Sequence, residues 1–385
     1  MTTVAILGGG NGGFAAAAHL HSLGHRVQLY NRSPATIQAI REAGGIAYSG
    51  VLGDGFAPLA LITTSVAEAL SGAHLIMVCL PAFALEHIAH DLAPLLDGTQ
   101  PILLNPGNTG GALALRQMLR NAGCRSLPPI AETNTLTYIC RKRAAGEIYI
   151  SSLVRNVRFA ALPASQTETI AEPVRELYPT LRPVEHVLLT ALSNVNAVLH
   201  PPGIVLSAAW IEHSGGDFRY YYDAGTPAVA QVMADLDRER LALGSAWGMA
   251  LEPFPALFAD IGSTSAEAGA SGSFLRMLRE SEPNRFIKAP PSLDSRYLHE
   301  DIPFGLVPMS ELARACGVAT PVMDALITLT SSMNRVDYRA RGWTLARLGL
   351  PADHAAAVGT LYSYRGGKDT CKLKRCRRCA ASQQR

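Results

Sequence analysis

The sequence lacks a long apolar run. Its longest apolar stretches, Leu75 to Leu80 and Pro101 to Leu104, have the length of a strand, whereas a helix that crosses a bilayer needs about 20 apolar residues. The N-terminus has no basic leader, and five glycines between positions 8 and 13 interrupt its apolar residues, so it does not have the pattern of a signal peptide. We therefore expect a cytoplasmic protein with no membrane partner.

Cysteine is scarce and scattered. Of seven cysteines in 385 residues, four stand far apart from one another, at positions 79, 124, 140 and 316. This distribution is typical of reduced thiols in a cytosolic enzyme and argues against a disulfide framework.

Charge is also sparse in the body of the chain. Charged residues make up 17% of the sequence, and the net charge of +3 comes from residues 365–385, where eight basic residues stand against one acidic residue. Residues 1–364 therefore carry a net charge of about −4. A body with this balance is not expected to bind nucleic acid.

What the sequence does have is a glycine-rich turn near its start. A short apolar strand, Val4 to Leu7, leads into the spacing GxGxxG, and a run of alanines follows. This is the order of strand, turn and helix that a dinucleotide-binding unit needs, because glycines allow a tight turn and a close approach to a pyrophosphate. Amide groups at the helix start would then bind the anion. The residues predicted to bind the cofactor are Gly8, Gly10, Asn11, Gly12 and Gly13.

The end of the second predicted strand, Arg26 to Tyr30, bears on which nicotinamide cofactor is used. An NAD-binding turn usually has an acidic residue at this point, but here Asn31, Arg32 and Ser33 follow. A guanidinium can pair with a 2′-phosphate, and the serine adds a hydroxyl. We predict that these three residues contact the cofactor and that it is NADP, with NAD also accepted. A solvated arginine without a ligand is the alternative.

Strands and helices alternate through the first half of the chain, and the apolar spacing becomes helical from Leu189 onward. The sequence therefore predicts an α/β fold in which a Rossmann-type, doubly wound sheet is followed by an all-α domain. The predicted boundaries are 1–188 for the nucleotide-binding domain, 189–362 for the helical domain and 363–385 for a basic tail.

Two segments of the helical half concentrate polar residues. His200 lies four residues after Asn196, on the same face of a helix that Pro201 and Pro202 are predicted to end. Because histidine titrates near neutral pH, His200 is the first candidate for an acid/base group, although a histidine buried in the core is more common. The second segment contains Asp294, Arg296, His299, Glu300 and Asp301. So many charged residues and a histidine in one short segment are compatible with either a functional site or a solvated loop.

Together the motifs resemble those of the octopine/nopaline (opine) dehydrogenase family. They occur in one order over roughly residues 1–345, and the histidine and arginine motifs are more specific than the glycine turn. The motifs are GGGNGG at the start, NPGNTGG from Asn105, AETNTLTY from Ala131, NAVLHPPG from Asn196, DLDRER from Asp235 and RYLHEDIPFGLVP from Arg296.

The resemblance implies an NAD(P)H-dependent oxidoreductase that condenses an L-amino acid with an α-keto acid. His200 would be the proton donor and acceptor, Asp301 would orient it, and Arg296 would bind the keto-acid carboxylate; Asp294 and Glu300 are alternatives to Asp301. The expected partners are these small molecules, and a homodimer is compatible with the sequence. The polar turn residues expected to orient substrate are Asn108, Thr109, Thr133, Asn134 and Thr135.

The sequence departs from the family motif at one position, and it also allows two other functions. Thr137 stands where the family motif has proline, which leaves the shape of the substrate loop open. A ketopantoate-reductase-like or β-hydroxyacid dehydrogenase shares the layout, but it is expected to have a catalytic lysine early in its helical domain, and no lysine occurs between Lys142 and Lys288. A non-catalytic NADP-sensing protein would need the fold but no histidine–carboxylate pair.

The basic tail has no counterpart in the family motifs and little to bury, so we predict that it is disordered. It contains Cys371, Cys376 and Cys379, but no second CxxC pair or histidine lies at zinc-binding spacing, and we expect no metal site. Truncation after Tyr364 is expected to leave kcat and KM unchanged in an assay of NADPH oxidation. A loss of activity together with a loss of stoichiometric zinc would contradict this prediction.

Overall fold

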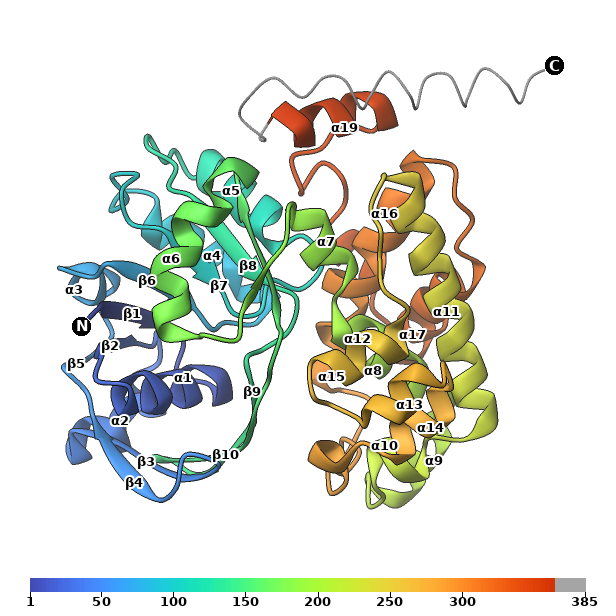
Figure 1. The fold of residues 1–385 in the computed structure, drawn as a ribbon, viewed down its shortest axis with the longest axis horizontal. Coiled ribbons are helices and arrows are strands. Elements are labelled where there is room, and N and C mark those ends of the chain that lie inside the picture. Colours follow the sequence, from blue (N-terminus) through green and yellow to red (C-terminus); the bar gives the residue numbers. More distant parts are fainter. Residues whose placement is uncertain (364–385) are drawn as a thin grey trace.

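The computed structural model describes residues 1–363, which form two lobes side by side (Figure 1). The first lobe contains two β-sheets, and the second is built from helices. Within residues 1–363, no helix is long and apolar enough to cross a membrane, and no group of three or more potential ligands could hold a metal ion. The tail, which was predicted to be disordered and free of metal, lies outside the described residues.

An eight-stranded sheet forms the centre of the first lobe, in the order β12-β11-β8-β7-β6-β1-β2-β5. The strands from β8 to β5 are parallel, and β11 joins β8 in the antiparallel sense. The strand order reverses between β1 and β6, which is where sheets of this kind bind ligands. The strands are β1 (Thr3–Leu7), β2 (Arg26–Tyr30), β5 (Leu61–Thr63), β6 (Leu75–Val78), β7 (Ile102–Leu104), β8 (Ile130–Thr133), β11 (Arg158–Leu162) and β12 (Arg182–Pro183).

A second sheet, in the order β4-β3-β10-β9, packs against the first helix, α1 (Asn11–Ser22). The sequence predicts short strands at 46–48 and 59–62 around a glycine-rich turn. In the structure, residues 45–50 and 55–58 pair on either side of that turn, and residues 61–63 form a strand of the large sheet. Parallel pairing of Glu147 with Ala47 joins segments too far apart to leave a local pattern. The strands are β3 (Gly45–Gly50), β4 (Gly55–Pro58), β9 (Tyr138–Ala144) and β10 (Glu147–Leu153).

Small residues let α1 lie close to the large sheet. Ala15 to Ala18 are fully buried, and a Cβ at Gly13 would lie 1.8 Å from the carbonyl oxygen of Gly8. Only glycine fits this contact, so the third glycine of the motif sets how closely the helix approaches β1. The other helices of this lobe are α2 (Pro34–Ala43), α3 (Val66–Leu70), η1 (Ala82–Ala84), α4 (Leu85–Leu92), α5 (Gly111–Asn121), η2 (Ala164–Gln166) and α6 (Thr167–Leu177).

The second lobe is organised around α8 (Val195–Leu206), which packs against α11, α15, α17 and η4. The predicted fold class, a Rossmann-type sheet followed by an all-α part, is confirmed. The remaining helices are α7 (Val187–Leu192), α9 (Ala208–Ser214), α10 (Tyr220–Asp223), α11 (Pro227–Ala246), α12 (Phe254–Asp260), α13 (Ala266–Ala270), α14 (Phe274–Arg279), η3 (Glu282–Asn284), α15 (Arg296–His299), η4 (Ile302–Leu306), α16 (Val307–Ala315), α17 (Pro321–Asn334), α18 (Tyr338–Arg341) and α19 (His354–Ser363).

The prediction that Pro201 and Pro202 end the helix of His200 is wrong, because α8 continues through both prolines. The helix is buried along most of its length, so tertiary packing outweighs the cost of proline in a helix interior. The hydroxyl of Tyr220 also supports the backbone here, at 3.1 Å from the carbonyl oxygen of His200. Gly203 makes room for that hydroxyl, since a Cβ at this position would lie 2.1 Å from its oxygen.

Glu132, the last but one residue of β8, is fully buried and joins the two lobes. Its Oε2 accepts a hydrogen bond from the amide of Ala112, and its Oε1 lies 2.5 Å from the hydroxyl oxygen of Thr190 on α7. The Thr190 hydroxyl also lies 2.8 Å from the carbonyl oxygen of Val187. Because one hydroxyl proton cannot serve both oxygens, a protonated Glu132 that donates to Thr190 satisfies all three groups. Burial agrees with this, since it raises the pKa of Glu132 to about 8.

This carboxyl is expected to make the folded state less stable as pH rises. A pKa raised from 4.5 to about 8 means that the folded protein holds a proton that the unfolded chain releases, so the free energy of unfolding should fall between about pH 4.5 and 8. Glu132→Gln keeps a donor and an acceptor and should flatten this dependence in urea unfolding. Glu132→Ala leaves the Ala112 amide unpaired and should cost roughly 2 to 4 kcal/mol at low pH, where the wild-type carboxyl is protonated, and less as pH rises. Identical pH dependence in the wild type and Glu132→Gln would contradict the assignment.

Candidate active site

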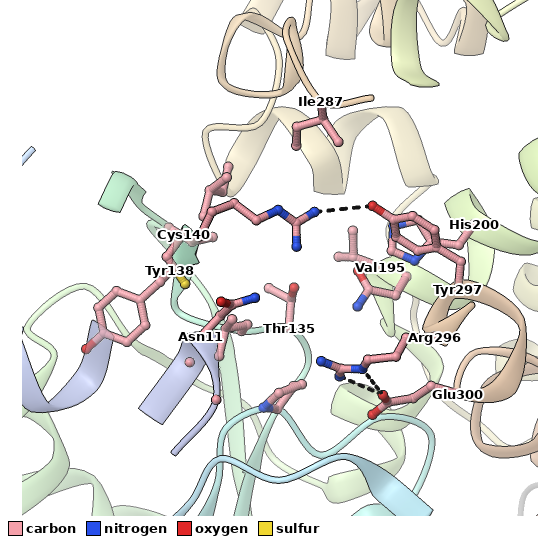
Figure 2. A pocket seen from close by; sticks show the side chains of 18 of the residues that line it. Asn11, Thr135, Tyr138, Cys140, Val195, His200, Ile287, Arg296, Tyr297 and Glu300 are labelled. Atoms are coloured by element: carbon pink, nitrogen blue, oxygen red, sulfur yellow. Dashed lines mark hydrogen bonds and ion pairs between the residues drawn. The ribbon is translucent and has the colours of Figure 1, made fainter. Parts of the chain in front are cut away.

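A cleft of about 940 Å³ lies between the carboxyl edge of the large sheet and the helical lobe. The turns after β1, β2, β6, β7 and β8 line it from one side, and α8 and α15 line it from the other. Figure 2 shows side chains from both lobes around this space, with Asn11 and Thr135 on the sheet side and His200 and Arg296 on the helical side. Residues from distant parts of the chain can therefore act on one ligand.

The glycine turn leaves open space at the start of α1. Gly8 has a φ of +124°, and a Cβ there would lie 2.5 Å from the carbonyl oxygen of Cys79, so this position needs glycine. A Cβ on Gly10, in contrast, would meet no atom within 4 Å. No side chain caps the first amide groups of α1. These residues fit the pyrophosphate of a dinucleotide, which would occupy the space at Gly10 and bind the helix N-terminus.

Contacts from β9 hold the glycine turn in place. The side-chain oxygen of Asn11 accepts a hydrogen bond from the amide of Lys142 at 3.0 Å, and the Lys142 ammonium donates to the carbonyl oxygen of Gly9 at 2.7 Å. The ammonium also lies 3.6 Å from the ring centroid of Phe14. Partial burial lowers the pKa of Lys142. The second sheet is thus attached to the turn through polar contacts.

The three residues after β2 differ in position. Asn31 lines the cleft, and its side-chain oxygen accepts a hydrogen bond from the amide of Gly9 at 2.9 Å. Its amide nitrogen donates to the carbonyl oxygen of Ser33. Arg32 and Ser33 are exposed beside the cleft and are not among the described residues that line it. The structure therefore uses Asn31 to hold the glycine turn and leaves the guanidinium of Arg32 at the surface.

His200 and Asp301 form a buried pair in the helical wall of the cleft. Nδ1 of His200 lies 2.7 Å from Oδ2 of Asp301, and the side chains are only 9% and 5% exposed. The packing of the π-helical turn η4 on α8 brings the two residues together. Burial raises the pKa of Asp301, and the His200 ring opposes that rise. The ring of Tyr297 lies beside His200, with 4.1 Å between the centroids (Figure 2).

The other two carboxylates considered as partners of His200 have partners of their own. Asp294 lies 2.8 Å from Nε2 of His299, whose Nδ1 lies 2.7 Å from the hydroxyl of Tyr338. Glu300 is paired with an arginine. Of the three candidates, Asp301 is the one hydrogen-bonded to His200.

Arg296 is held by that second carboxylate and faces the cleft. Its Nε and Nη2 atoms donate to Oε2 of Glu300 at 3.0 and 2.6 Å (Figure 2). Oε1 of Glu300 accepts from the amide of Ala82 and from the side chain of Asn108. The Glu300 side chain is 8% exposed, whereas that of Arg296 is 69% exposed. A buried carboxylate thus fixes an accessible guanidinium, which is an arrangement that suits an anionic ligand.

Of the five polar turn residues expected to orient substrate, Asn108 and Thr135 line the cleft. The other three are buried and bond to the protein itself, so the structure does not bring them into the cleft. These bonds run between Thr109 and the side chain of Asn194, from Thr133 to the carbonyl oxygen of Thr135, and from Asn134 to the carbonyl oxygen of Ser193.

The loop that carries Thr137 in place of proline is closed by a pair of hydrogen bonds. The amide of Thr137 donates to the side-chain oxygen of Asn105 at 3.1 Å, and the Asn105 amide group donates to the hydroxyl of Thr137 at 2.8 Å. A proline could not make the first of these bonds because it has no N–H.

Arg141 and Tyr297, which were not among the predicted site residues, also line the cleft. Nη2 of Arg141 lies 3.4 Å from the hydroxyl of Tyr297, so the two residues meet across it. Tyr297 directly follows Arg296 in the chain, and that neighbouring position was the available signal. No sequence pattern pointed to Arg141, because its strand, β9, was not predicted.

Two family models match the chain. One, described as "NAD/NADP octopine/nopaline dehydrogenase, alpha-helical domain", matches residues 183–334, the segment that carries His200, Arg296 and Asp301. The other, described as ketopantoate reductase PanE/ApbA, matches residues 4–117, which include the glycine turn.

Solved structures share the fold. An octopine dehydrogenase in complex with NADH and agmatine superposes with a TM-score of 0.74 at 19% identity, covering 96% of this chain and 99% of that chain. A yersinopine dehydrogenase bound to NADP+ gives a TM-score of 0.71 at 15% identity, covering 95% and 99%. A ketopantoate reductase from Ralstonia eutropha JMP134 gives 0.60 at 19% identity, covering 86% and 98%.

Curated relatives match along both lobes. The opine dehydrogenase of Arthrobacter sp. (strain 1C) is 36% identical over 356 residues, which cover 92% of this chain and 97% of the relative. The protein ocs of Agrobacterium tumefaciens (strain Ach5) is 27% identical over 372 residues, covering 93% and 98%. This chain therefore belongs to the octopine/nopaline (opine) dehydrogenase family of NAD(P)-dependent oxidoreductases that act on CH–NH donors.

Proposed function

We propose that this protein condenses an L-amino acid with an α-keto acid and reduces the resulting imine with NADPH. The observation that carries the proposal is that the buried His200–Asp301 pair and the accessible guanidinium of Arg296 share one cleft with the glycine turn. Solved octopine dehydrogenases with NADH and L-arginine, and with NADH and pyruvate, support these substrate classes.

The residues of the glycine turn would hold the cofactor, which supplies a hydride to the imine carbon. Gly10 would admit the pyrophosphate, and the amide groups at the start of α1 would bind it. Asn31 and Lys142 would act indirectly, since both hydrogen-bond to the backbone of Gly9 and keep the turn in its open shape.

His200 would move the protons of the condensation. Attack of the amine on the keto carbon gives a carbinolamine, and loss of water from it gives the imine, so both steps need a group that exchanges protons near neutral pH. Asp301 is bonded to Nδ1 of His200, which would fix the tautomer and leave Nε2 for the substrate. The carboxylate would also stabilise the imidazolium that forms during proton transfer.

Arg296 would bind the carboxylate of the keto acid. Its planar guanidinium can make paired hydrogen bonds to a carboxylate, and Glu300 holds its other edge. Asn108 and Thr135 line the same cleft and could complete the polar contacts of this substrate.

We also propose that the two lobes act as domains that divide near residue 188. The last strand of the large sheet is β12 (Arg182–Pro183), and the helical part begins with α7 at Val187. Closure of the lobes over the cleft would bring the groups of both sides onto the substrates and exclude water.

A reaction of the ketopantoate reductase type is the second candidate, since a model of that family matches residues 4–117. That reaction is expected to use a lysine from the helical domain. No lysine occurs between Lys142 and Lys288, and none is among the described residues that line the cleft. The condensation is therefore the better supported function.

Replacing His200 with Ala is expected to lower kcat by roughly 100-fold or more, because the ring moves protons. Affinity for NADPH should stay unchanged, because His200 does not contact the glycine turn. The rates are measured as NADPH oxidation with pyruvate and a panel of L-amino acids, and the affinity by fluorescence titration.

His299→Ala is the matched control for this experiment. His299 is also bonded to an aspartate, at 2.8 Å, but it does not line the cleft, so the variant should keep its turnover. Near-normal turnover of His200→Ala would refute the proposed role of the histidine.

Arg32→Ala is expected to raise the KM for NADPH by roughly tenfold or more, since a charged pair with the 2′-phosphate would be lost. The KM for NADH should change little because NADH lacks that phosphate. Arg41→Ala, which removes another exposed arginine from the adjoining α2, serves as the control. A wild type that prefers NADH would show that the assignment of NADPH is wrong.

A further inference from the structure

We propose that Arg141 binds the carboxylate of the amino-acid substrate. The inference rests on the proposed function, in which the amino acid and the keto acid each bring one carboxylate into the same cleft. Two carboxylates that leave water need cations or hydrogen-bond donors in its place. Among residues 1–363, the cleft is lined by two arginines, Arg141 and Arg296, and by no lysine.

The charge of Arg296 is already compensated. Two of its nitrogens donate to the same oxygen of Glu300, and that carboxylate is buried. Arg296 can still offer its remaining N–H groups to one carboxylate. The Arg296–Glu300 pair brings no net positive charge, however, and so does not balance a second substrate anion.

Arg141 has no such partner. Its guanidinium is exposed to the cleft and forms no ion pair with a carboxylate in the part of the chain that the structure describes. Its side-chain hydrogen bond runs to the hydroxyl of Tyr297 and is long, at 3.4 Å. Its positive charge acts on Tyr221, which also lines the cleft. Burial raises the pKa of the Tyr221 hydroxyl, and the charge of Arg141 opposes that rise. An uncompensated guanidinium in a substrate cleft suits a carboxylate from outside the protein.

The position of Arg141 relative to His200 suits the amino acid, since Arg296 is already assigned to the keto acid. Arg141 comes from β9 of the sheet lobe and reaches Tyr297 on α15 of the helical lobe. The Tyr297 ring lies 4.1 Å from that of His200, centroid to centroid. In an amino acid, one carbon separates the amine from the carboxylate, so a carboxylate on Arg141 would present the amine toward the acid/base group. Arg296 would bind the carboxylate of the keto acid on the helical side of the cleft.

The first test compares Arg141→Gln with the wild type in NADPH oxidation with pyruvate and a panel of L-amino acids. The KM for the amino acid should rise roughly 10- to 100-fold, as for the loss of a charged hydrogen-bonded contact, while the KM values for pyruvate and NADPH stay within about twofold of the wild type. Arg141→Lys should recover part of the loss. Arg143→Gln is the matched control, because Arg143 lies on the same strand, packs over the ring of Tyr149 and does not line the cleft.

The second test removes the carboxylate from the substrate. The primary amine that corresponds to the best amino acid should be a poor substrate of the wild type, and Arg141→Gln should use amine and amino acid with similar kcat/KM. A rise in the KM for pyruvate or for NADPH in place of that for the amino acid would overturn the inference and leave the proposed function standing. A wild type that oxidises NADPH with no pair in the panel would overturn the proposed function, and this inference with it.

Discussion

The hydrogen bond between His200 and Asp301 is the contact on which the arrangement of the cleft depends. It joins α8 to the turn η4 at a point where both side chains are buried. Removing one member of a buried pair leaves the other uncompensated, which costs about 3 to 5 kcal/mol in other proteins. The same bond that would orient the histidine for proton transfer therefore also fixes how η4 packs on α8.

Several polar residues of the sequence motifs lie outside the cleft and support it through buried hydrogen bonds. Three residues on the sheet side, Thr109, Glu132 and Asn134, make buried hydrogen bonds to residues 190–194, the segment directly before α8. Arg240 is fully buried on α11 and donates to the carbonyl oxygen of Leu192 in the same segment. Buried polar groups that are fully paired specify one arrangement of the chain. These residues thus set the start of the helix that carries His200.

The two arginines of the cleft differ in how their charge is balanced. Arg296 is fixed by a buried carboxylate, so its geometry is set before any ligand binds. Arg141 is attached to the opposite wall through one long contact with Tyr297. A guanidinium held in place by a carboxylate can orient a bound ligand. A guanidinium whose charge is not compensated attracts an anionic ligand more strongly. Because the two arginines stand on different lobes, movement of the lobes would change the distance between the groups that we propose to bind the two substrates.

The sequence by itself determined the glycine-rich turn between β1 and α1, the fold class, and the choice of His200, Asp301 and Arg296 as candidates, because these depend on local spacing and on motifs that occur in one order. It could not choose among Asp294, Glu300 and Asp301, since three carboxylates in one short segment differ only in what they pack against. It also missed Arg141, whose strand, β9, pairs with β10, which in turn pairs with the distant β3. Tertiary packing decided these points, and it kept α8 helical through two prolines because burial of the whole helix outweighs a local preference.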